Sequence, residues 1–150
     1  MSYATRGDDY WSRTVDAVSP RCSSQASLAM QIIALCGSGS ILELGCGTGE
    51  LVHELALRGA TVVGVDASCR AIARAADRSS IRCVVADMRS TPFGDASFDA
   101  VIAVHSVEWL DERHVTDAIA EMFRVSRGLA CLWIAADQGG AAHHHATVRP

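Results

Sequence analysis

The sequence predicts an α/β fold of three layers, in which helices cover both faces of a mostly parallel sheet. Short apolar runs alternate with longer helical segments along most of the chain, and such alternation indicates strands joined by right-handed crossovers. The first of these runs contains Glu43 near its end, and glycines follow at Gly45, Gly47 and Gly49. A glycine-rich turn after a strand is typical of α/β proteins that bind a nucleotide at the carboxyl ends of their strands.

Two helices are expected before the first strand. Residues 8–18 and 24–36 carry helical patterns that Pro20 separates, and the second helix is expected to stop at Gly37. The first strand then follows at 40–44, where a short apolar run precedes the glycine-rich turn.

Two helices and one strand are expected between the first and third strands, in the order helix, strand, helix. A helix over 49–58 is expected to end at Gly59, because glycine suits the residue after a helix C-terminus. A second strand is expected at 61–65. The Ala- and Arg-rich stretch 68–77 predicts a short helix, and a third strand is expected at 82–86.

The second half of the chain predicts two further strands with a helix between them. Residues 90–97 contain Pro, Gly and Asp and indicate a loop or a single helical turn. The mostly apolar stretch 98–104 indicates a strand covered on both faces. A helix is expected at 112–126, where apolar residues recur on one side, and the Arg-Gly pair at 127–128 is expected to turn the chain into strand 129–135.

Length and composition point to one domain over residues 1–150. Apolar residues make up 49% of the chain, which is enough for a substantial core, and the net charge of −4 gives no footprint for nucleic acid. The six cysteines have no paired short spacing, so we expect reduced thiols in a cytoplasmic protein and no zinc site. A charged N-terminus and the lack of a long apolar run favour neither a signal peptide nor a membrane segment.

The spacing of the glycine-rich turn restricts its ligand. A dinucleotide fingerprint needs its third glycine one residue after Gly49, where this chain has Glu50. A carboxylate at a helix N-terminus would repel a pyrophosphate group. The turn therefore favours a nucleoside without phosphates, and S-adenosylmethionine is such a ligand.

Four ordered signals make residues 40–135 resemble the class I S-adenosylmethionine-dependent methyltransferases. They are ELGCGTG at 43–49, VVGVDAS at 62–68, VADM at 85–88, and PF at 92–93 followed by SFDAV at 97–101. The resemblance implies a Rossmann-like fold with strand order 3-2-1-4-5 and a core at 40–135. It also implies that S-adenosylmethionine is the cofactor and S-adenosylhomocysteine its product.

The resemblance also implies which residues hold this cofactor. Glu43 would help to hold the turn and the cofactor amino group, Asp66 would accept from both ribose hydroxyls, and Asp87 would accept from the adenine amino group beside the backbone of Met88. The full set of cofactor-binding residues expected in this way is Glu43, Gly45, Cys46, Gly47, Gly49, Asp66, Ala67, Asp87, Met88 and His105.

Candidate catalytic residues follow the fourth strand, which in this class of enzymes ends near the cofactor methyl group. His105 is a candidate general base, with a pocket-lining role as the alternative. Glu108, the second candidate catalytic residue, is expected either to face the substrate or to cap the next helix. Aromatic residues at 3, 10 and 11, within the N-terminal region 1–39, are expected either to form a lid or simply to cover the sheet.

The C-terminus is shorter than the resemblance implies. Similar enzymes usually add a two-stranded antiparallel hairpin beside strand five, whereas here residues 136–150 are expected to form a flexible tail. The three adjacent histidines at 143–145 invite a metal site, but we expect a solvated tail instead, because adjacent residues cannot all point at one ion and no nearby Cys or acid pair completes a site. An apolar strand at 129–135 would then be a bare edge, unless the tail covers it, a second copy pairs with it, or the chain is truncated. We expect a homodimer through the strand-five side.

These observations favour an S-adenosylmethionine-dependent methyltransferase that acts on a small molecule, without nucleic-acid or membrane partners. The alternative is a non-catalytic module that binds S-adenosylmethionine or S-adenosylhomocysteine and acts as a regulatory or partner subunit. A NAD-dependent oxidoreductase conflicts with Glu50 and with the motif around Asp87.

Overall fold

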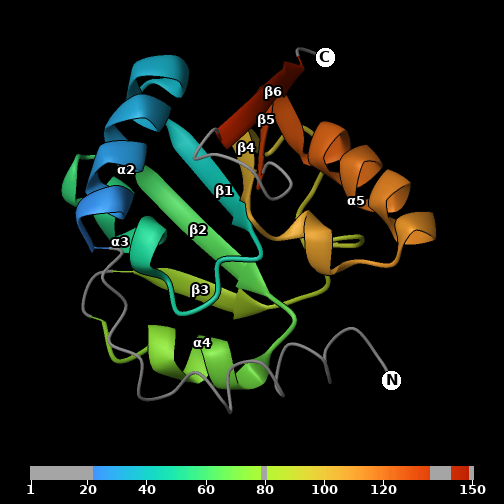
Figure 1. Ribbon diagram of the computed structural model, residues 1–150, viewed down its shortest axis with the longest axis horizontal. Helices are drawn as coiled ribbons and strands as arrows, with labels where there is room; N and C mark the ends of the chain where they lie inside the picture. The colour runs from blue at the N-terminus through green and yellow to red at the C-terminus, as the bar shows by residue number, and fades with distance from the viewer. Residues whose placement is uncertain (1–21, 79–80, 136–142, 149–150) are drawn as a thin grey trace.

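The computed structural model describes residues 22–78, 81–135 and 143–148, and they form a six-stranded sheet with helices on both faces (Figure 1). The first five strands are parallel, with the order 3-2-1-4-5 that the sequence predicts. The strands are β1 (Ser40–Leu44), β2 (Thr61–Asp66), β3 (Arg82–Val85), β4 (Phe98–Val104), β5 (Ser126–Ala135) and β6 (His143–Val148). The expected first helix and the aromatic residues of the expected lid lie outside the described residues.

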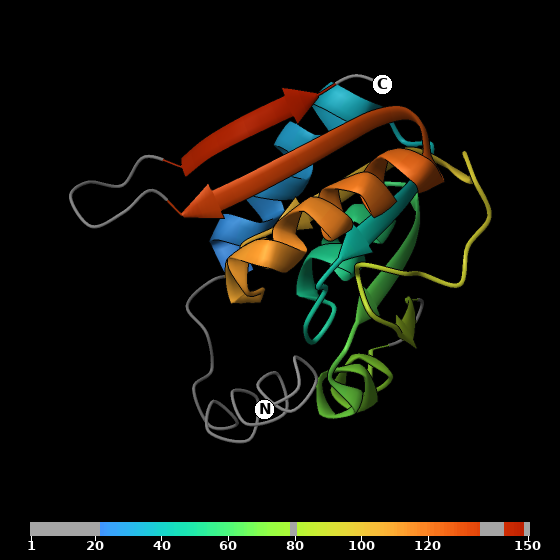
Figure 2. The same ribbon diagram turned by 90° about the vertical axis from the view of Figure 1, so that its right-hand side faces the viewer.

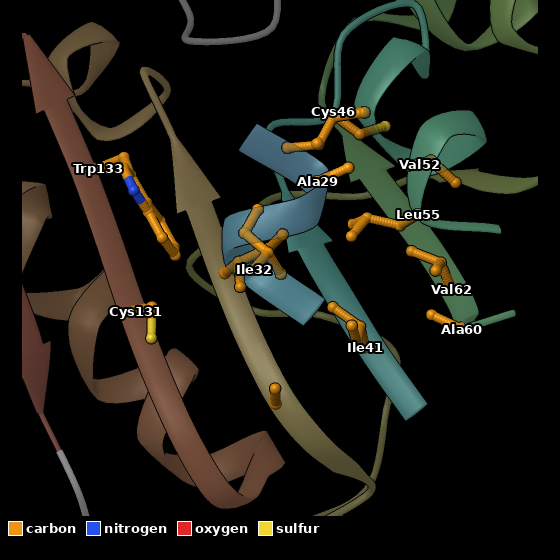
Figure 3. Close-up of a cluster of buried hydrophobic side chains, with 13 residues drawn as sticks. Ala29, Ile32, Ile41, Cys46, Val52, Leu55, Ala60, Val62, Cys131 and Trp133 are labelled. Carbon is orange, nitrogen blue, oxygen red and sulfur yellow. The ribbon is translucent and has the colours of Figure 1, made fainter. Parts of the chain in front are cut away.

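The alternation of side chains along β1 divides the core into two clusters. Ile41 is fully buried on one face, against Ile32 of helix α2 (Cys22–Cys36) and Leu55 of helix α3 (Glu50–Leu57), as Figure 3 shows. Leu42 points to the other face and is buried with Met122 of helix α5 (Glu112–Val125). Successive residues of a strand face opposite sides, so five residues of β1 anchor helices on both faces of the sheet.

Two short helical segments complete the layers. Helix α4 (Cys69–Ala75) begins after Ser68, whose hydroxyl accepts a hydrogen bond from the Ala71 amide. A 3-10 helix, η1 (Val107–Trp109), follows β4 and was not expected from the sequence. Among the described helices, none combines the length and the apolar character that crossing a bilayer requires.

The expected turn at 127–128 is wrong, because these residues lie within β5. The strand starts at Ser126, directly after α5, and Ser126 pairs with Phe98 while Leu129 pairs with Ala100. One extra residue on β5 therefore forms a bulge. A Cβ atom on Gly128 would lie 2.6 Å from the Asp99 carbonyl oxygen, so the bulge needs glycine at this close approach.

Part of the expected tail instead forms β6, which pairs antiparallel with β5 (Figure 2). The register joins Trp133 to His145 and Ala130 to Val148. Strand β5 is therefore not the bare edge that the sequence suggested, and the tail itself covers it. In the described part of the chain, one antiparallel strand takes the place that a two-stranded hairpin occupies in similar enzymes.

Candidate functional site

The glycine-rich turn connects β1 to α3 at the carboxyl edge of the sheet. Gly45, Gly47 and Gly49 have φ angles of 74°, 54° and 75°, in the left-handed region that disfavours other residues. A Cβ atom on Gly45 would lie 2.3 Å from the Cβ atom of Ser106, which follows β4. The hydroxyl of Ser106 donates to the Leu44 carbonyl oxygen at 2.8 Å, so the turn and the end of β4 are closely packed.

Asp66, the last residue of β2, links the turn to the next crossover. Its Oδ2 accepts from the Gly47 amide at 2.9 Å, and its Oδ1 accepts from the Ser68 amide at 2.9 Å. The amides of Gly45 and Cys46 both donate to the Val65 carbonyl oxygen, at 2.7 and 2.9 Å. Asp66 therefore supports the glycine-rich turn directly, a role that the sequence suggested for Glu43.

Arg78, just beyond α4, braces the same turn from the other side. Its Nε donates to the Thr48 carbonyl oxygen at 3.0 Å, and its Nη2 lies 3.3 Å from Glu50 Oε1. The first residue of α3 thus combines a favourable position at the helix N-terminus with an ion pair. Nothing in the local sequence around residue 78 indicated this contact, because it spans about 30 residues.

Glu43 is buried beside this network, with only 4% of its surface exposed. Its Oε2 atom is buried and has no hydrogen-bond partner within the described part of the chain. Burial, together with the neighbouring Cys83 and Asp66, raises the pKa of Glu43 to about 8. A carboxyl group in this state lacks a donor or a cation that would stabilise its ionised form.

Asp87 lies just after β3 and forms a fork-like ion pair with Arg89. Arg89 Nε donates to Oδ1 at 2.9 Å, Nη2 donates to Oδ2 at 2.6 Å, and the Arg89 amide donates to Oδ1 at 2.9 Å. These bonds with Arg89 lower the pKa of Asp87. The Ser90 amide closes the turn by donating to the Asp87 carbonyl oxygen at 3.0 Å.

His105 and Glu108 come together at the end of β4, as the two candidate catalytic residues. His105 has a φ of 49°, which is uncommon for a residue other than glycine, and its amide donates to the Trp133 carbonyl oxygen at 2.8 Å. The imidazole Nδ1 lies 3.4 Å from Glu108 Oε1. Trp109 follows in η1 with 47% of its surface exposed. A strained backbone of this kind often marks a functional site.

The remaining expected cofactor residues line the same edge, where their side chains are mostly buried. Cys46 and Met88 are 7% and 2% exposed. A hydrogen bond with Cys83, together with burial, raises the pKa of the Cys46 thiol. A Cβ atom on Gly64 of β2 would lie 2.7 Å from the Cys46 sulfur. The sequence gives one indication of this contact between β2 and Cys46: a glycine inside a strand often marks a place where another part of the chain approaches closely.

Comparison with known proteins places the chain in a family. Residues 41–128 match the model of a family described as a methyltransferase domain. This match covers the glycine-rich turn and all four sequence signals, and the chain therefore belongs to the methyltransferase domain family. The expectation of a class I S-adenosylmethionine-dependent methyltransferase is confirmed at the level of the family.

Individual relatives share parts of this domain. The 18S rRNA (guanine-N(7))-methyltransferase bud23 of Schizosaccharomyces pombe is 29% identical over 117 residues, which cover 76% of this chain and 43% of that protein. O-methyltransferase cnsE of Penicillium expansum is 36% identical over 93 residues, which cover 56% of this chain and 34% of that protein. This chain thus spans less than half the length of these curated relatives.

A solved structure agrees with the fold. The magnesium protoporphyrin IX methyltransferase of Synechocystis PCC 6803, solved with bound S-adenosylmethionine, superimposes with a TM-score of 0.74 at 17% identity. The match covers 92% of this chain and 78% of that one. This agreement confirms the Rossmann-like arrangement of the sheet and its helices.

Proposed function

We propose that this chain binds S-adenosylmethionine at the carboxyl ends of β1, β2 and β3 and directs methyl transfer to a small-molecule acceptor. The observation that carries the proposal is Glu43, whose buried Oε2 has no hydrogen-bond partner among the described residues and lies beside a turn of three left-handed glycines. A cationic amino group is the donor that such an atom needs. A buried acceptor beside a nucleotide-binding type of turn therefore fits a ligand that joins a nucleoside to an amino acid.

The chain's own residues would bind the two ends of this ligand. Asp66 would bind the two ribose hydroxyls, because its two acceptor oxygens match two adjacent O–H donors; the same carboxylate also accepts from the amides of Gly47 and Ser68. Asp87 is an ionised acceptor for an exocyclic amine. Asp66 and Asp87 give this edge a negative potential that favours a cation, and Glu43 would add its own negative charge when a cationic group binds beside it.

The pair of His105 and Glu108 provides a group that can take a proton from the acceptor. Bound S-adenosylmethionine would supply an electrophilic methyl group. Nδ1 of His105 lies 3.4 Å from Glu108 Oε1, and the imidazole would take the proton of a hydroxyl or ammonium group as a general base. Alignment of the acceptor with the methyl group and exclusion of water would provide the remaining acceleration of methyl transfer.

A small-molecule acceptor is favoured over RNA by charge. The chain carries a net charge of −4, which opposes binding to a phosphate backbone. One relative is named as an rRNA methyltransferase and another as an O-methyltransferase. We therefore propose that this chain resembles the O-methyltransferase more than the rRNA methyltransferase in its acceptor. The acceptor would be a small molecule that loses a proton when it is methylated.

Calorimetry with S-adenosylhomocysteine tests the binding part of this proposal. We expect the Asp66→Ala variant to lose binding, because it removes both the ribose acceptor and the bond to the glycine-rich turn. The matched control is Asp77→Ala, at an exposed aspartate just after α4, which should bind like the unmodified chain. Unchanged affinity in Asp66→Ala would contradict the site.

Turnover separates an enzyme from a binding module. The unmodified chain is incubated with S-adenosylmethionine and a panel of small hydroxyl, carboxyl and amine compounds, and S-adenosylhomocysteine is measured by mass spectrometry. Formation of S-adenosylhomocysteine that depends on one acceptor and falls in His105→Ala supports the enzyme. Binding without conversion by any acceptor would favour the alternative, a non-catalytic regulatory or partner subunit.

A further inference from the structure

The turn after β3 holds the Asp87 carboxylate in one orientation. Three N–H groups of Arg89 donate to it: the backbone amide and Nε to Oδ1, and Nη2 to Oδ2 at 2.6 Å. A carboxylate offers about four lone-pair positions. Contacts among the described residues therefore occupy three positions, and the fourth belongs to Oδ2, which takes only a longer second contact of 3.1 Å from Nε.

The surroundings keep this carboxylate ionised. The pKa of Asp87 is lowered by hydrogen bonds from the Arg89 side chain, against the opposing effect of burial, and the charge of His114 on α5 acts in the same direction. The pair borders a cavity of about 430 Å³ between the turn and α5. The α5 residues that line this cavity are His114, Asp117, Ala120, Glu121 and Arg124.

An ionised carboxylate can only accept hydrogen bonds, and this property distinguishes two purines. Adenine presents an exocyclic amino group, which donates, whereas hypoxanthine presents a carbonyl oxygen at the same position, which accepts. A protonated Asp87 could donate to the carbonyl oxygen, and a freely rotating carboxylate could turn away from it. A carboxylate fixed by Arg89 with one open lone pair serves the amino group and leaves the carbonyl oxygen facing another acceptor.

We propose that Arg89 is a positioning residue, which holds Asp87 as an oriented, ionised acceptor and thereby makes the site select adenine over hypoxanthine. This inference rests on the proposed function, because it assumes that the site takes the nucleoside of S-adenosylmethionine. Arg89 acts through Asp87 and needs no contact of its own with the ligand. Lysine cannot replace it fully, since an ammonium group lacks the planar fork that engages both oxygens.

The test compares two ligands, S-adenosylhomocysteine and its deaminated analogue S-inosylhomocysteine, by calorimetry at neutral pH. We expect the unmodified chain to bind the adenine compound at least about tenfold more tightly. Arg89→Ala should bind S-adenosylhomocysteine about tenfold more weakly and should discriminate less between the ligands. Arg89→Lys should recover part of the loss, and Asp87→Asn should reverse the preference, because its amide group can donate to the carbonyl oxygen.

Controls separate this role from a general effect on folding. Arg113→Ala, at an exposed arginine on α5, should leave both affinities unchanged, and thermal unfolding checks that each variant is folded. An unchanged ratio of the two affinities in Arg89→Ala would overturn the role of Arg89 alone. Tighter binding of S-adenosylhomocysteine by that variant would also overturn it, since Arg89 would then compete with adenine. No binding of S-adenosylhomocysteine by the unmodified chain would overturn the proposed function as well.

Discussion

At the residue scale, Glu43 shows how burial sets the chemistry of the site. An isolated ionised carboxylate is costly to bury, so the group stays protonated at neutral pH unless a cation or donor is near. In the part of the chain that the structure describes, its Oε2 atom lacks such a partner, and its pKa rises to about 8. The unliganded protein therefore carries a destabilising group at the position where our proposal puts the cofactor amino group.

This arrangement predicts a pH-dependent stability. The folded-state pKa of Glu43 lies above its ordinary value of 4.5, so its favourable contribution is fully present below pH 4.5 and is lost as the pH rises to about 8. Glu43→Gln should remove this dependence and raise the free energy of unfolding at pH 8 to 9 by roughly 2–5 kcal/mol. Urea denaturation at several pH values measures the effect.

The matched control for this prediction is Glu112→Gln, which changes an exposed glutamate at the start of α5. It should keep the pH dependence of the unmodified chain. If Glu43→Gln and Glu112→Gln give the same slope of stability between pH 5 and pH 8, Glu43 is not the group responsible.

At the element scale, α5 holds the loop that follows Asp87. Glu121, which is 6% exposed, accepts from the amide and hydroxyl of Thr91 at 2.7 and 2.6 Å and from Arg124 Nε and Nη2, both at 2.7 Å. Arg124 also donates to the Phe93 carbonyl oxygen at 2.8 Å. Burial alone would raise the pKa of Glu121, but these hydrogen bonds outweigh it and lower the pKa.

We predict that Glu121→Gln lowers the free energy of unfolding by about 1–3 kcal/mol at pH 7, because an amide group presents donors to other donors. Since the folded-state pKa is lowered, the contribution of Glu121 is present above its ordinary pKa of 4.5 and is lost as the pH falls further. Chemical denaturation at pH 7 and pH 3 should therefore show a smaller difference at the lower pH.

Asp95→Asn is the control for this element, because Asp95 pairs with the same arginine but is 80% exposed. Exposed ion pairs contribute little, so we expect a change below about 0.5 kcal/mol. An equal loss of stability in the two variants would mean that the burial of Glu121 has no part in anchoring the loop.

At the scale of the whole molecule, β6 changes the argument for a dimer. It covers β5 along the register from Ala130 to Ala135, although Ile134 of β5 remains 38% exposed. Within the described residues β6 is now the edge of the sheet, and exposed edge strands tend to pair with other chains. The homodimer through the strand-five side stays a prediction, with β6 as its contact.

Light scattering at micromolar concentration tests this prediction. We expect twice the chain mass of 15.9 kDa, since a two-fold axis would pair β6 with its copy. Ala146→Pro removes one backbone N–H from this strand and should shift the mass towards the monomer. A monomeric mass for the unmodified chain would rule out the dimer at that concentration.

The sequence by itself determined the layered fold, the order of five parallel strands and the glycine-rich turn. These features depend on the local spacing of apolar residues and on the backbone angles that residues such as Gly45 can adopt. Both are properties of short stretches of sequence. Only the tertiary structure decided that Asp66 supports the turn, that Arg89 fixes Asp87 and that β6 covers β5. Hydrogen-bond partners and burial depend on distant segments brought together by folding, and the His-rich strand β6 has no alternating pattern that would reveal its pairing.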